Sequence, residues 1–151
     1  MTVYKSPMPE ISIKYKAGHL KKALVTCSQH LYEVFKEMYD QDTVEIIESM
    51  VVLYLNNGNK TIGWTRHSSG GTCHTVVDVR MIMTEALLCG ATTIAISHNH
   101  PSGQLFPSKE DERITQKLKA ACDFMQMRLL DHIIVPGDLN GYYSFCDEGK
   151  I

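Results

Sequence analysis

Residues 92–100 read Thr92-Thr93-Ile94-Ala95-Ile96-Ser97-His98-Asn99-His100, an apolar run that ends in two histidines. The run predicts a buried strand that stops at the first histidine. Because residues two apart in an extended chain point to the same side, His98 and His100 aim their imidazoles at one point. Residues 101–103 then turn the chain into a helix, whose first turn carries Asp111. Two nitrogens and one oxygen meeting there indicate a divalent metal site with one open position.

The rest of the chain predicts an α/β domain, with one mixed sheet and helices packed on its faces. Apolar residues at helical spacing predict helices over about 28–39, 79–89 and 109–127, with N-caps at Ser28, Asp78 and Ser108 and a C-cap at Gly90. Apolar runs predict further strands over about 50–55, 61–66, 75–77, 129–135 and 142–145. A hairpin turn is expected over 56–59, because asparagine and glycine tolerate positive φ.

The composition is that of an ordinary soluble globular protein, with 151 residues of which 44% are hydrophobic and 21% are charged. This length is most simply one domain, and the net charge of −2 offers no general basic field for nucleic acid. A local excess of lysine over acid occurs only before residue 27. We therefore interpret residues 1–27 as a solvated arm with a possible edge strand over 11–15, and residues 28–151 as the domain. A phosphate-contacting arm is the alternative interpretation.

Cysteine usage and hydropathy bear on the compartment. The five cysteines occur singly and form no C-x-x-C pair, which argues against a disulfide framework and against a cysteine zinc site. No apolar run approaches the length of a membrane span, and the N-terminus lacks a signal-peptide core. We therefore expect a reducing compartment, with the cytoplasm as the simplest choice.

Each part of the metal hypothesis has a structural alternative. Two histidines at this spacing occur by chance, and Ser108 with Asp111 matches a plain capping box at a helix start. Pro101 and Gly103 are ordinary turn residues. A capped helix, however, does not need two histidines before it, and burying two histidines together is costly. The combination therefore favours a shared site.

The spacing of these residues also carries a resemblance to a known family. The pattern H-x-H-P-x6-S-x2-D is formed by His98, His100, Pro101, Ser108 and Asp111, and it resembles that of the JAMM (MPN-type) metalloproteases. The runs His98–Gly103 and Leu130–Val135 resemble the bacterial RadC-like branch, and the similarity extends from about residue 28 to the C-terminus. It implies a JAB/MPN fold with a cytidine-deaminase-like three-layer α-β-α architecture. The helix-hairpin-helix-like domain of long RadC proteins is not expected, because too few residues precede residue 28.

The resemblance also implies a role for each residue of the site. The metal ligands would be His98, His100 and Asp111, with Zn²⁺ as the first expectation and Mn²⁺, Fe²⁺ or Co²⁺ as alternatives. A glutamate at the start of the central strand would be the general base; Glu48 matches by position, and Glu45 is the competitor. Ser108 would donate a hydrogen bond to the developing oxyanion. The bond cleaved would be a peptide or isopeptide amide.

Two other classes of function are open. RadC-like proteins are traditionally labelled DNA repair proteins, so a nucleic-acid-processing or DNA-binding role is one alternative, and a non-catalytic MPN interaction module is the other. The expected partner is a protein or peptide substrate; nucleic acid is the weaker expectation, and a membrane is not expected. A zinc deaminase fits poorly, because the sequence has no P-C-x-x-C pair.

A few polar and aromatic residues carry smaller predictions. We interpret His132, which lies inside an apolar strand, as a hydrogen-bonded core histidine or as a partner of a metal ligand. Surface positions are expected for His74 and Arg80, and a turn position for Ser102. Packing roles are expected for the aromatic residues Trp64, Tyr142 and Tyr143.

Overall fold

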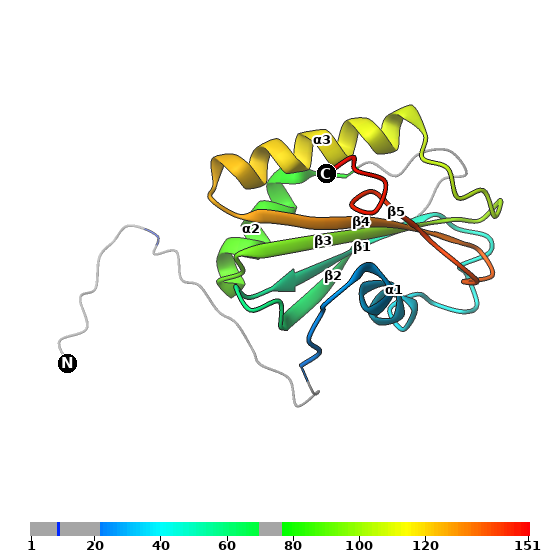
Figure 1. Cartoon of the computed structure of the whole chain (residues 1–151), viewed down its shortest axis with the longest axis horizontal. Coiled ribbons are helices and arrows are strands. Elements are labelled where there is room, and N and C mark those ends of the chain that lie inside the picture. Colours follow the sequence, from blue (N-terminus) through cyan, green and yellow to red (C-terminus); the bar gives the residue numbers. More distant parts are fainter. Residues whose placement is uncertain (1–8, 10–21, 70–76) are drawn as a thin grey trace.

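The computed structural model describes residues 9, 22–69 and 77–151, and in this part of the chain three helices flank one five-stranded sheet (Figure 1). The helices are α1 (Ser28–Lys36), α2 (Val79–Cys89) and α3 (Lys109–Phe124). The strands are β1 (Ser49–Leu55), β2 (Thr61–Ser69), β3 (Thr93–His100), β4 (Arg128–Pro136) and β5 (Tyr143–Ser144). The predicted α/β class with a mixed sheet is confirmed. The predicted strand over 11–15 and most of that over 75–77 lie outside the described residues.

The described sheet has the strand order β2-β1-β3-β4-β5. β3 and β4 run parallel, while the other neighbouring pairs are antiparallel. All seven residues of β1 are buried, as predicted for a central strand covered on both faces, because β2 and β3 flank its edges and helices pack on both sides of the sheet. The turn that leads from β1 to β2 contains Asn59 with a φ of 57°. The asparagine-rich hairpin turn is therefore confirmed.

The core has two halves, because alternate residues of a strand point to opposite faces of the sheet. On one face, Phe35 of α1 belongs to a buried cluster with Val51 and Leu53. On the other face, the helices α2 and α3 cover a second cluster, in which Leu118 of α3 joins Val52. Figure 1 shows α1 and α3 on opposite sides of the strands. The result is a three-layer α-β-α arrangement.

β3 continues past the point where the sequence predicted its end. The prediction stopped the strand at His98, but β3 runs to His100, because β4 pairs alongside it as far as Pro136. β2 also extends beyond its predicted end, to Ser69. The longer β3 keeps both histidines in extended geometry, so they share the face of the sheet that α3 covers.

The prediction for the start of α1 was wrong by one residue. Its N-cap is Cys27, and Ser28 is the first helical residue. The Ser28 hydroxyl instead donates to Asp147 Oδ2 at 2.6 Å, a tertiary contact that no local pattern contains. Both predicted caps of α2 are confirmed. The Asp78 side chain accepts from the Arg80 N–H, and Gly90, with a φ of 69°, is the left-handed C-cap. α1 and α3 end at residues 36 and 124, earlier than the predicted 39 and 127.

The aromatic predictions have mixed outcomes. Tyr142 packs as predicted, since it stacks on Tyr32 with ring centroids 4.7 Å apart. Trp64 is 46% exposed, so its predicted packing role is wrong. The reason is that Trp64 lies on β2, the outermost strand at one side of the described sheet. Its ring is partly covered by the Arg66 guanidinium at 5.9 Å.

Two further observations concern the thiols and the helices. Cys27, Cys89, Cys122 and Cys146 are free thiols, and Cys73 lies outside the described residues. Across the described ranges, no helix combines the length and apolar character that crossing a bilayer requires.

Candidate metal centre

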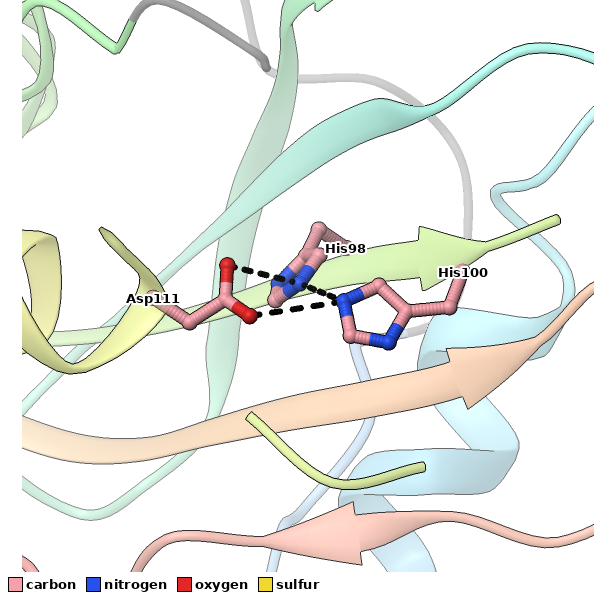
Figure 2. A group of neighbouring side chains, drawn as sticks. All are labelled: His98, His100 and Asp111. Atoms are coloured by element: carbon pink, nitrogen blue, oxygen red, sulfur yellow. Dashed lines mark hydrogen bonds and ion pairs between the residues drawn. The ribbon is translucent and has the colours of Figure 1, made fainter. Parts of the chain in front are cut away.

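Three side chains meet where β3 ends and α3 begins, and these are the predicted metal ligands (Figure 2). The Nε2 atoms of His98 and His100 lie 2.8 Å apart. Asp111 Oδ1 is 3.1 Å from His98 Nε2, and Asp111 Oδ2 is 3.4 Å from His100 Nε2. The His98 side chain is 1% exposed, whereas those of His100 and Asp111 are 14% and 12% exposed. The cluster is therefore buried at His98 and reaches solvent at the other two residues.

The first turn of α3 holds the Asp111 carboxylate in place. The Ser108 hydroxyl oxygen accepts from the Asp111 N–H at 3.1 Å, and Asp111 Oδ2 accepts from the Ser108 N–H at 2.7 Å. The predicted capping box is therefore confirmed. Burial raises the pKa of the Asp111 carboxyl, but the neighbouring His100 and His98 rings, which donate to it when they are protonated, outweigh burial and hold this pKa well below its ordinary value. Asp111 is consequently ionised at neutral pH.

His100 presents a nitrogen lone pair to the cluster. Its Nδ1 lies 2.5 Å from the Gln104 carbonyl oxygen, which only accepts, so Nδ1 carries a hydrogen. In the neutral ring, Nε2 is therefore unprotonated and faces Asp111. Burial lowers the pKa of His100, but the bonds to Asp111 and Gln104 raise it more, so that it exceeds its ordinary value. A proton and a metal ion therefore compete for Nε2.

A chain of hydrogen bonds assigns the tautomer of His98. Thr115 Oγ1 donates to the Asp111 carbonyl oxygen at 2.6 Å, so the same hydroxyl accepts from His132 Nδ1, which is also 2.6 Å away. His132 Nε2 is then an acceptor and takes the hydrogen of His98 Nδ1 at 2.7 Å. Burial lowers the pKa of His132 well below its ordinary value, so its ring is neutral, as this chain requires. His98 Nε2 is left with a lone pair that faces the cluster.

When both imidazoles are neutral, the cluster thus brings three hydrogen-bond acceptors together, and no hydrogen atom lies between them. Two imidazole lone pairs 2.8 Å apart repel each other unless a proton or a metal ion lies between them. One ligand atom from each of the three residues lies within 4.8 Å of the other two. Two nitrogens and a carboxylate oxygen suit Zn²⁺ and other divalent ions of the first transition series. The residues present therefore fit a divalent metal ion.

Glu48 lies directly before β1 and is half-buried. The paired register of β1 and β3 ends with Met50 opposite His98, so Glu48 lies two residues beyond the paired segment, at the end of the sheet where β3 carries the histidines. Its negative charge also contributes to the raised pKa of His100. Glu45, the competitor, is exposed.

The remaining predicted residues lie as follows. Ser108 is exposed, and its hydrogen bond with the Asp111 N–H uses an oxygen lone pair and not the hydroxyl hydrogen. His132 is a buried, hydrogen-bonded histidine, as predicted, and its ring stacks on Phe145 with centroids 4.6 Å apart. The surface position of Arg80 and the turn position of Ser102 are confirmed. His74 lies outside the described residues.

Two residues that sequence reasoning did not single out lie beside the cluster. Thr115 follows Asp111 by four residues, and this helical spacing was the signal that could have placed it on the same face of α3. Asn99 alternates with the two histidines and therefore points to the opposite face of β3, where it is fully buried. For Asn99, the signal in the sequence was its place between two candidate metal ligands, where a polar residue is followed and preceded by a histidine.

A mixed sheet between helical layers, with a His-His-Asp cluster at the end of an inner strand, defines the JAB/MPN class of α/β domains. Within that class, the sequence model of the RadC-like JAB domain matches residues 25–150, and the chain belongs to this family. The resemblance seen in the motif is thus confirmed over almost the whole chain.

The relatives of the chain come from diverse bacteria. It is 46% identical over 102 residues to a UPF0758 protein of Flavobacterium johnsoniae, a match that covers 68% of this chain and 44% of the relative. It is 37% identical over 141 residues to a UPF0758 protein of Haemophilus ducreyi, with 92% and 60% covered. A UPF0758 protein of Aquifex aeolicus is 32% identical over 142 residues, with 94% and 58% covered. The chain therefore spans about half the length of the curated relatives that it matches.

Proposed function

We propose that this protein is a metal-dependent hydrolase of the JAMM type, which uses activated water to cleave a peptide or isopeptide amide bond. The observation that carries the proposal is the meeting of two imidazole lone pairs and an ionised carboxylate at one partly exposed point. Membership of the RadC-like JAB family supports the same chemistry.

In this proposal the metal is held by His98, His100 and Asp111. Zn²⁺ is the first choice, because a site of two imidazoles and one carboxylate is of borderline softness, and Mn²⁺, Fe²⁺ and Co²⁺ suit the same ligands. When bound, the ion supplies a Lewis acid that lowers the pKa of a water molecule and polarises the amide carbonyl. The capping box and the hydrogen bonds of the two rings orient the ligands before the metal arrives.

Glu48 acts as the general base and then as the general acid. Its carboxylate takes a proton from the attacking water and delivers it to the nitrogen of the departing amine. Its half-buried position directly before β1, and the contribution of its charge to the raised pKa of His100, support this role over one for the exposed Glu45.

Ser108 stabilises the negative charge that develops on the amide oxygen. Its hydroxyl oxygen already accepts from the Asp111 N–H, so the hydroxyl hydrogen points elsewhere and is available to an oxyanion. One such donor is often worth about 3 kcal/mol to the transition state.

The partner in this proposal is a protein or peptide that presents an amide bond. A reducing compartment, the cytoplasm, agrees with the four free thiols among the described residues.

Metal analysis and a defined substrate pool test the proposal together. We expect the purified 151-residue chain to carry about one divalent metal ion and to cleave some members of a pool of synthetic peptides and lysine-branched isopeptides, scored by mass spectrometry. Glu48→Gln should keep the metal and lose about 100-fold or more in rate, because the proton acceptor is gone. Glu45→Gln is the matched control and should cleave normally. Full cleavage by Glu48→Gln, or a chain that never binds metal, would contradict the proposal.

A further inference from the structure

Asn99 stands between the two histidines but faces the other side of β3. Its amide is completely buried and contacts the segment 44–49, which leads into β1. Asn99 Oδ1 accepts from the Ser49 N–H at 2.8 Å and from the Ser49 hydroxyl at 3.3 Å. Asn99 Nδ2 donates to the carbonyl oxygens of Val44 at 2.7 Å and Ile47 at 2.8 Å. Both hydrogens and both lone pairs of the amide are thus used on this one segment.

These contacts enclose Glu48 on both sides along the chain. The Ile47 carbonyl directly precedes Glu48, and the Ser49 N–H directly follows it. One side chain therefore fixes the peptide groups on either side of Glu48. Asn99 is also the residue between His98 and His100 in the chain. This buried amide thus ties the backbone around Glu48 directly to the strand segment that carries the histidines.

A close backbone approach holds the same segment from another side. A Cβ atom on Gly137, just after β4, would lie 3.2 Å from Glu45 Cα and 3.0 Å from the Pro101 carbonyl oxygen. Real Cβ atoms are rarely this close to backbone, so glycine at position 137 lets the two loops approach without displacing each other. The loop before Glu48 and the loop after His100 are therefore packed together through Gly137.

We infer that Asn99 is a positioning residue, which fixes the Glu48 carboxylate beside His100 by clamping the segment 44–49. This inference rests on the proposed function, in which Glu48 is the base. The two faces of one short strand segment then have separate tasks. His98 and His100 present ligand atoms on the face covered by α3, and Asn99 places the proton acceptor from the opposite face.

The first test needs no activity and uses hydrogen exchange of the metal-free 151-residue chain. In Asn99→Ala, we expect the Ser49 amide and the turn amides of Val44 and Ile47 to exchange about tenfold faster or more, because the segment loses its anchor. Asn99→Asp is a second variant that keeps the acceptor for Ser49 but turns a carboxylate oxygen toward the Val44 and Ile47 carbonyl oxygens, which it repels, so it should free the turn amides more than Ser49. Thr93→Ala is the control, since Thr93 lies on the same face of β3, is also buried and pairs with Leu55 at the far end of β1. Unchanged exchange over 44–49 in both Asn99 variants would overturn the inference.

The second test asks whether Asn99 acts through Glu48. We expect zinc affinity of Asn99→Ala within about threefold of the unmodified chain, because the ligands lie on the other face. Turnover of the synthetic peptide pool should fall about 100-fold, with the effect on kcat and not on KM. In the Glu48→Gln background, Asn99→Ala should cost less than about twofold more.

The outcomes of this second test separate the two ideas. Losses that multiply in the double variant would show that Asn99 acts independently of Glu48, which overturns the inference while leaving the proposed hydrolase intact. A chain that binds zinc but cleaves no member of the pool counts against the proposed function. In that case the hydrogen-exchange result still decides whether Asn99 clamps the segment.

Discussion

Two histidine–carboxylate clusters lie on the same face of the sheet, on either side of Met50. In the strand register, Met50 lies opposite His98 of the candidate metal centre on one side and opposite His67 on the other. At the second cluster, His67 Nε2 lies 2.7 Å from Glu85 Oε2. Tyr54 and Thr65 also donate to that oxygen. The two clusters contain similar residue types, yet their hydrogen atoms are distributed in opposite ways.

The direction of the hydrogen bonds separates a metal site from a structural cluster. At Glu85, three donors surround one carboxylate oxygen, so the negative charge is satisfied by the protein itself. At Asp111, the neighbouring histidines turn lone pairs toward the carboxylate, so they do not offset its negative charge, and a cation bound there would be stabilised. Counting donors against acceptors therefore distinguishes the two clusters where counting histidines and acids does not.

The largest expected effect is the loss of metal affinity on removing a histidine from one cluster and not from the other. His98→Ala should weaken zinc binding by more than about a thousandfold, because each ligand carries a large share of the binding free energy. His67→Ala should bind zinc normally. Competition titration with a chromogenic chelator measures both, with circular dichroism as the check on folding. Equal losses in the two variants would mean that donor direction does not distinguish the clusters.

A smaller effect is expected from a threonine that never touches the metal. In Thr115→Val, His132 Nδ1 loses its acceptor, so the ring is free to reverse its tautomer and turn the His98 hydrogen toward the cluster. Zinc affinity should fall about 10- to 100-fold.

Two further variants sharpen this prediction. Thr115→Ser keeps the hydroxyl and should restore zinc affinity. The matched change in the second cluster, Thr65→Val, should leave zinc affinity unaltered. A Thr115→Ser protein as weak as Thr115→Val would point to packing and not to the hydrogen-bond chain.

The smallest expected effect concerns the stability that the second cluster provides. Burial raises the pKa of Glu85, but the hydrogen bonds from Tyr54, His67 and Thr65 outweigh it, so the pKa lies below the ordinary value of 4.5. A lowered carboxyl pKa stabilises the fold above the ordinary value, and this contribution is lost as the pH falls through the folded-state value. Glu85→Gln should therefore lower the unfolding free energy by about 1–2 kcal/mol at pH 7.

Urea unfolding at several pH values measures this difference. The difference in unfolding free energy between the unmodified chain and Glu85→Gln should narrow as the solution is acidified below pH 4.5. Zinc affinity at pH 7 should be the same in both proteins. A gap that stays constant with pH would show that the ionised state of Glu85 is not what stabilises the cluster.

The sequence predicted the candidate ligands because their spacing is local. His98, His100 and Asp111 lie within one strand end and one helix start, where period-two alternation and capping chemistry are readable from the residues. The strand end itself was predicted too early, since its length depends on β4, which pairs as far as Pro136. Local pattern and partner strand thus contribute separately to the same site.

Local sequence patterns could not predict contacts between segments that are distant in the chain. The β1–β3 pairing that brings Met50 opposite His98 joins strands about fifty residues apart in sequence, so position alone could propose Glu48 without testing its distance from the histidines. The hydrogen-bond chain through His132 requires β4 and α3 to be already packed. The wrong N-cap at Ser28 has the same cause, because its hydroxyl is taken by Asp147 near the C-terminus.

The crossing at Gly137 limits how this protein can vary. A Cβ atom at that buried position would be tight against both loops, so we expect a side chain there to shift the loop after His100 relative to the loop that carries Glu45 by a few tenths of an ångström or more. In a saturation library, substitutions there should yield folded chains that still capture metal but have lost the alignment between the two halves of the site. Position 137 would thus be intolerant of change although its residue has no functional group, and an engineer who redesigns these loops has to preserve the crossing first.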